Sequence, residues 1–137
     1  MQPDMLLGQL ILNVVLLARA VEGEGCLTMV EPMECATWLV HCALYRSTRP
    51  WWHDSIEVLV RSAFHGVARV QEPSQEALSL TIRALTEPKL IHGCAFMVSE
   101  ADYQAHPEWS RTLIKKSFWN ENETAGLHFL ETWPGTK

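Results

Sequence analysis

The chain has 137 residues, with 11 Lys or Arg against 16 Asp or Glu, so its formal net charge is −5. This length predicts a single domain over residues 1–137, and a hydrophobic content of 47% with 20% charged residues excludes extensive disorder. The acidic balance argues against a nucleic-acid partner, and the absence of about 18 consecutive apolar residues argues against a membrane span.

The N-terminal segment is the first candidate element. Residues 5–17 are strongly apolar, and the Ala-Arg-Ala sequence at 18–20 has the form of a signal-peptide cleavage site. The residues before the apolar run contain an acid and no base, which is not typical of a signal peptide. We therefore predict no signal peptide but a core helix over residues 4–22, with Asp4 as its N-cap. Its expected core positions are Leu6, Leu10, Val14 and Leu17.

Three further helices are predicted in chain order, over residues 34–47, 55–63 and 73–87. In each of them apolar residues recur at steps of three and four, which is the period of a helix with one buried face. The glycines at 23 and 25 are expected to end the first helix, and Pro50 follows the end of the second.

The last third of the chain has the sequence pattern of β-strands. Strands are expected over residues 94–98, 113–119 and 127–133, with a turn or short helix capped by Ser99 after the first strand. The polar residues 120–126 read as a hairpin loop between the last two strands. The order of these predicted helices and strands indicates an α+β fold, mainly helical, in which helices are followed by a small antiparallel sheet.

The four cysteines form no CxxC motif, and we expect them to be buried free thiols. The alternative is two disulfides in any of three pairings, except that Cys35 and Cys42, two helical turns apart, are too distant to bridge. His92 and Cys94 form one short-spaced ligand pair, whereas a structural zinc site usually has two. We therefore predict no metal and no cofactor.

Glu24 lies between two glycines, just past an apolar helix. A carboxylate held at the edge of a core is poorly solvated, so its pKa should rise toward the range of a general acid. The competing interpretation is a solvated turn glutamate, and position alone leaves both open.

The sequence LARAVEGEG at residues 17–25 resembles the LAR-x-V-x-G-E signature of the cell-wall hydrolase family that includes the spore cortex-lytic enzymes. Over about residues 14–132, later segments follow the order and spacing of this family. The chain departs from the pattern at Tyr45, where the family has Asn, and at Ala63, where it has Gln. The aromatic-rich strand of the family is reduced to Phe96. The corresponding segments are Tyr45-Arg46, Ala63-Phe64, residues 95–99 and His128-Phe129-Leu130.

This resemblance implies a lysozyme-like fold, peptidoglycan glycan strands as the partner, and Glu24 as the catalytic residue. A lytic transglycosylase needs no second carboxylate, whereas a retaining, muramidase-like hydrolase needs one about 5 Å away. One clear glutamate favours the transglycosylase route slightly. The candidates for a second carboxylate are Glu22, Glu31, Glu34, Glu100 and Asp102.

Substrate-binding candidates come from the matched segments and from exposed aromatic residues. Trp51 and Trp52 follow Pro50, so at least one of them should be exposed for sugar stacking, with packing as the alternative. Ser99 matches the polar residue that ends the family's strand. The substrate-binding candidates are Phe64, His65, Ser99, Glu100, Trp52 and Tyr103.

Without a convincing signal peptide, synthesis in the host cytoplasm and action on the wall fit a phage-type enzyme. It would be an endolysin or a virion-borne protein that contacts phage tail or other virion proteins. The alternative is an inactive lysozyme-like module of a phage particle, with a structural or glycan-binding role.

Overall fold

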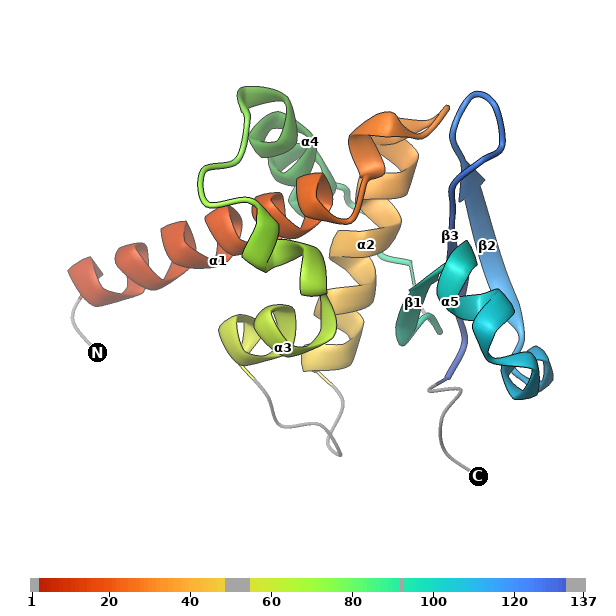
Figure 1. The fold of residues 1–137 in the computed structure, drawn as a ribbon. Helices are drawn as coiled ribbons and strands as arrows, with labels where there is room; N and C mark the ends of the chain where they lie inside the picture. Colours follow the sequence, from red (N-terminus) through yellow and green to blue (C-terminus); the bar gives the residue numbers. More distant parts are fainter. Residues whose placement is uncertain (1–2, 49–54, 92, 133–137) are drawn as a thin grey trace.

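The computed structural model describes residues 3–48, 55–91 and 93–132. Within these ranges the fold is α+β and mainly helical, as predicted: four α-helices precede a three-stranded antiparallel sheet, and a short fifth helix follows its first strand. The four helices gather on one side of the molecule and the sheet lies on the other (Figure 1).

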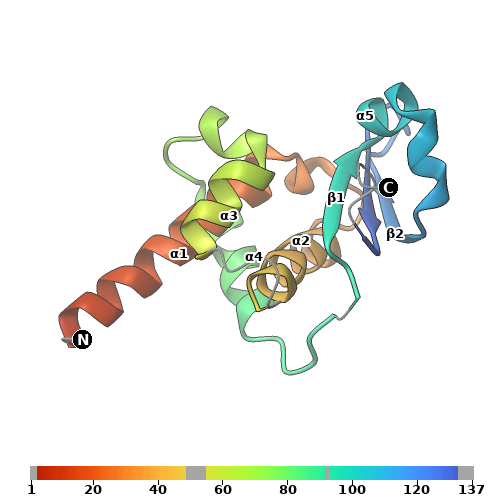
Figure 2. The same ribbon diagram turned by 90° about the horizontal axis from the view of Figure 1, so that it is seen from below.

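The first helix, α1 (Pro3–Gly23), begins one residue before the predicted N-cap, Asp4. Its C-terminal half enters the core, where Leu17 is completely buried. Its N-terminal half extends away from the rest of the chain in both views (Figures 1 and 2), and Leu6 and Leu10 are 55% and 58% exposed. The prediction of a core helix is therefore wrong for this half, because no other described element reaches it.

The segment Leu6–Gly23 is long and apolar enough to cross a membrane by composition alone. Only 28% of it is buried in the fold, and Val14, at the boundary, is half-buried. A core helix and a signal sequence share this composition, so the helix by itself does not decide the location of the protein.

The next three helices are α2 (Pro32–Ser47), α3 (Ile56–Ala63) and α4 (Gln75–Leu85). Helix α2 starts two residues earlier than predicted because it opens on a proline, whose fixed φ suits the first turn. The hydroxyls of Ser55 and Ser74 cap α3 and α4 by accepting backbone N–H groups. Each helix buries the face that the periodicity predicts, with core residues Cys35, Leu39, Cys42, Leu59, Val60, Ala77, Leu80, Thr81 and Ala84.

His41 ties α2 to α4 inside the core. Its Nε2 lies 2.8 Å from the carbonyl of Ala84, and its Nδ1 accepts the N–H of Ile91 at 3.0 Å. Because Nδ1 is the acceptor, the proton of the neutral ring is on Nε2 and is donated to Ala84. This histidine is therefore structural, as the sequence suggests.

The sheet is formed by β1 (Phe96–Ser99), β2 (Ile114–Trp119) and β3 (Gly126–Leu130), with β3 in the centre and antiparallel to both neighbours. Strand β1 begins two residues later than predicted. It leads into α5 (Glu100–Ala105), and Ser99 caps this helix by accepting the N–H of Asp102, as predicted.

Strand β3 is buried on both faces. On one face Phe129 packs against Trp38 of α2, with ring centroids 5.7 Å apart. On the other face His128 packs against Tyr103 of α5, at 5.1 Å. The sheet is thus enclosed between α2 and α5, and its β1 edge faces the end of α1.

Candidate active site

A cleft of about 900 Å³ separates the helical part of the molecule from the sheet. The ends of α1, α2 and α3 and the 3₁₀ helix η2 (His65–Arg69) form one wall, which consists of Gly23, Glu24, Tyr45, Arg46, Ser62, Ala63, His65 and Arg69. Strand β1 and the segments around it form the other, which consists of residues 95–99, Asp102, Trp109, Leu127, Glu131 and Thr132.

Glu24 is held at the C-terminal end of α1. Its N–H donates to the carbonyl of Ala20 at 2.9 Å, so its backbone continues the last turn of the helix. Gly25 then adopts a left-handed conformation, with φ of 90°, and ends the helix. One carboxyl oxygen of Glu24, Oε1, accepts the backbone N–H of Gly66 at 3.0 Å. Both the main chain and the side chain of this residue are therefore positioned.

The backbones of Gly23 and Gly66 touch beneath the carboxyl group. A Cβ atom on Gly23 would lie 2.0 Å from the carbonyl oxygen of Gly66, and a Cβ atom on Gly66 would lie 2.3 Å from the carbonyl carbon of Gly23. Neither distance is possible for non-bonded atoms. Gly23 is the last residue of α1, so the helix ends there as expected. Glycine is required at this position because another backbone crosses it.

We expect Gly66→Ala to lower the free energy of unfolding by at least about 2–3 kcal/mol and to displace Glu24, because rigid backbone atoms must separate to admit the methyl group. Denaturant unfolding measures this loss. The matched control is Gly8→Ala, since Gly8 has nothing within 4 Å and lies in an exposed helix, where alanine should stabilise by up to about 1 kcal/mol. Equal effects of the two substitutions would contradict the tight crossing.

Burial raises the pKa of Glu24 above its ordinary value, and the nearby negative charge of Asp102 adds to this rise. The N–H of Gly66 and the positive charges of His65 and Arg69 act against it. Desolvation is the largest of these effects. Glu24 is therefore protonated to a higher pH than a solvated glutamate, as a general acid requires.

The structure brings three of the predicted site residues together at the cleft, namely Glu24, His65 and Ser99. Phe64 is not a wall residue, because its side chain is 3% exposed and belongs to the hydrophobic core. Trp52 lies outside the described residues, as does Trp51.

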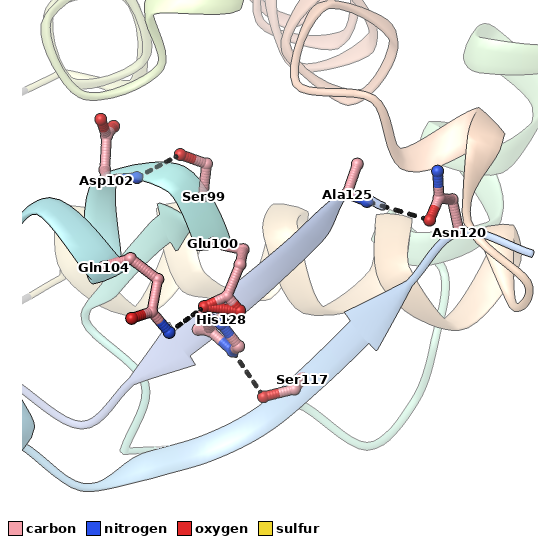
Figure 3. Close-up of polar contacts among 8 residues, drawn as sticks. All are labelled: Ser99, Glu100, Asp102, Gln104, Ser117, Asn120, Ala125 and His128. Atoms are coloured by element: carbon pink, nitrogen blue, oxygen red, sulfur yellow. Dashed lines mark hydrogen bonds and ion pairs between the residues drawn. The ribbon is translucent and has the colours of Figure 1, made fainter. Parts of the chain in front are cut away.

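Glu100 and Tyr103 do not line the cleft either. Glu100 lies 3.3 Å from Nε2 of His128 and accepts a hydrogen bond from Gln104, while Nδ1 of His128 lies 2.7 Å from the hydroxyl of Ser117. Figure 3 shows Glu100 and Gln104 pointing toward His128 and Asp102 pointing away from it. This polar cluster fastens α5 to the outer face of the sheet.

Asp102 takes the place that Glu100 was expected to fill. Residues two apart in a helix face nearly opposite directions, so only one of the two can face the cleft. The capping hydrogen bond from Asp102 N–H to Ser99 was the signal for this register, since it fixes where α5 begins. No local pattern in the sequence indicates that Arg69 and Trp109 line the cleft.

In the part of the chain that the structure describes, no three His, Cys, Asp or Glu side chains gather closely enough to share a metal ion. His106 stacks on Trp109, and its Nδ1 lies 2.9 Å from the carbonyl oxygen of Asp102, which is a structural arrangement. The site is thus built from one buried acid, nearby charges and a mixed polar and aromatic cleft.

We compared the chain with protein-family models, with curated proteins and with solved structures, and none of them matches. The geometry of the cleft and the motif at residues 17–25 are the two features of the chain that indicate a function.

Proposed function

We propose that this protein is a lysozyme-like enzyme that cleaves the glycan strand of peptidoglycan, with Glu24 as general acid and then general base. The observation that carries the proposal is the environment of Glu24: a carboxyl group with a pKa raised by burial, aligned by the Gly66 N–H, at the wall of a cleft of about 900 Å³. The family resemblance of residues 17–25 points to the same residue.

The hydrogen bond from Gly66 indicates which oxygen of Glu24 carries the proton. Oε1 accepts an N–H and so behaves as the carbonyl oxygen, which leaves the proton on Oε2. Donation from Oε2 to the glycosidic oxygen breaks the bond to the sugar and generates an oxocarbenium-like transition state. The resulting carboxylate is stabilised by the Gly66 N–H and by the charges of His65 and Arg69.

Two routes complete the reaction. In the transglycosylase route the Glu24 carboxylate takes a proton from the 6-hydroxyl of the sugar, and an anhydro ring closes. In the hydrolytic route a second carboxylate assists, and Asp102, whose charge acts on Glu24, is the candidate that the cleft provides. We favour the transglycosylase route, in which Asp102 has only an electrostatic effect on Glu24.

The experiment that tests the proposal is zymography on purified peptidoglycan with mass analysis of the products. Cleavage that yields anhydro ends supports the transglycosylase route, and new reducing ends support hydrolysis. No cleavage at enzyme concentrations stoichiometric with the substrate would contradict the enzymatic proposal. Co-sedimentation with peptidoglycan in that case would favour the glycan-binding module instead.

The charges around Glu24 predict opposite pH shifts for two variants. Asp102→Asn removes a charge that raises the pKa of Glu24, so the alkaline limb of kcat/KM should move to lower pH. Arg69→Gln removes a charge that lowers this pKa, so the same limb should move to higher pH. Full pH profiles of the two variants and the wild type measure these shifts.

The two variants serve as controls for each other, because both remove a charge from the cleft wall. Shifts in the same direction, or none, would mean that Glu24 does not set the alkaline limb. Loss of all cleavage in Asp102→Asn would indicate that Asp102 reacts directly and would favour the hydrolytic route.

A further inference from the structure

The four cysteines lie in two pairs. The sulfur atoms of Cys26 and Cys35 are 3.4 Å apart, and the side chain of Cys42 lies near that of Cys94, which raises the pKa of the Cys42 thiol. All four are free thiols and buried, as the sequence predicts. Cys35 and Cys42 share one face of α2, and each meets a partner from another segment.

Cys26 and Cys94, the partners of the two α2 cysteines, lie next to the two walls of the cleft. Cys26 opens the 3₁₀ helix η1 (Cys26–Thr28), two residues after Glu24. Cys94 directly precedes residues 95–99 of the opposite wall. Helix α2 is part of the first wall through Tyr45, so the Cys26–Cys35 pair joins two elements of that wall and the Cys42–Cys94 pair joins α2 to the opposite wall.

We propose that Cys26–Cys35 and Cys42–Cys94 are the two disulfides that this chain forms under oxidising conditions, and that they link α2 to the segment after Glu24 and to the segment before β1. In the Cys26–Cys35 pair the sulfur atoms must approach from 3.4 Å to about 2.0 Å, which small side-chain rotations can achieve. Because the sulfur atoms of Cys26 and Cys35 are already in contact, their bridge leaves Cys42 and Cys94 as the second pair.

The chemistry balances with oxidised glutathione, a small disulfide, as the oxidant. For each bridge two protein thiols give up two protons and two electrons, and the sulfur–sulfur bond of one oxidised glutathione breaks to give two reduced molecules. Mutual hydrogen bonding and burial raise the pKa of the Cys26 and Cys42 thiols. The thiolates of Cys26 and Cys42 are therefore scarce in the folded chain, and all four sulfur atoms are buried, so the bridges should form during folding rather than after it.

The test is refolding of the reduced, denatured chain in a buffer of reduced and oxidised glutathione, followed by peptide mapping without reductant. Cleavage after Glu34 and Trp38 separates the first three cysteines. We expect Cys26 linked to Cys35 and Cys42 linked to Cys94, and a Tm that falls by on the order of 10 °C when a reductant is added. Any other pairing, or four free thiols after refolding, would overturn the proposal.

Single serine variants give matched controls. Cys26→Ser should leave Cys35 as the one thiol open to alkylation and keep the Cys42–Cys94 bridge; Cys42→Ser should do the converse. A bridge from Cys35 to Cys94 in the first variant would contradict the assigned pairing. These measurements use no substrate, so their outcome is independent of the proposed glycan cleavage.

Discussion

Replacing Glu24 with Gln should reduce glycan-strand cleavage by at least about 10²-fold, while the chain keeps its fold. Gln is nearly isosteric with Glu, and its side-chain oxygen can still accept the N–H of Gly66 that holds the wild-type carboxyl group. What it cannot do is donate a proton to the leaving oxygen. Initial rates on soluble glycan fragments, together with circular dichroism, separate loss of the acid from loss of structure.

The same substitution should stabilise the protein at neutral pH. Burial raises the pKa of Glu24 in the folded chain above the ordinary 4.5, so between these two values the folded chain binds more protons than the unfolded chain. The free energy of unfolding of the wild type should therefore fall as pH rises through this window. The Gln variant has no such charge to bury, and its Tm should exceed that of the wild type on the neutral side.

Glu22→Gln is the matched control for this experiment. Glu22 lies two residues away and accepts the N–H of Ser74 at 2.7 Å, but it is not a wall residue of the cleft. Its substitution should leave cleavage unchanged. If the Glu24 variant cleaves as fast as this control, Glu24 is not the acid and the proposed function fails.

Deletion of residues 1–20 should prevent folding. This deletion removes Leu16 and Leu17, which are completely buried, and each such side chain stabilises the core by about 1.5–3 kcal/mol. The same deletion removes the Ala20 carbonyl that binds the N–H of Glu24. The Leu16 and Leu17 side chains alone contribute about 3–6 kcal/mol of a typical total stability of about 5–15 kcal/mol, and the deletion also removes the buried Ala18 and Ala20, so the remaining chain should not fold. Circular dichroism and thermal unfolding measure the outcome.

Deletion of residues 1–10 is the control, and it should preserve the fold and the Tm. The deleted side chains include Leu6, Leu7 and Leu10, all more than half exposed. A folded, active chain that starts at Val21 would contradict the role of α1 in the core. It would also support a signal peptide and undermine the phage-type proposal.

The sequence predicted the parts of the fold that depend on near neighbours in the chain. Ser99 was identified as a helix cap because a serine before a helical turn can accept its free N–H groups, and it does. Ser55 and Ser74, which begin two other predicted helices, act in the same way. The position of Glu24 at a helix end follows from the glycine after it, again a local signal.

Errors arose where the outcome depends on distant segments. The apolar pattern places Leu6 on the hydrophobic face of a helix, but it does not show whether another element is long enough to cover that face. None of the described elements covers Leu6. The hydrogen bond that aligns Glu24 comes from Gly66, 42 residues away, so no local pattern encodes it. Glu100 was placed in the cleft instead of Asp102 because a shift of two residues reverses the helix face.

The contact between Gly23 and Gly66 has a consequence for protein engineering. Because only main-chain atoms meet there, the position of Glu24 does not depend on the side chains of the opposite wall. Under the proposed function, a randomised library at Met97 and other positions of that wall, with Ser99 kept as the cap of α5, should change which sugar is accepted without repositioning the acid. Active members of such a library should keep both glycines unchanged while the sheet wall diversifies.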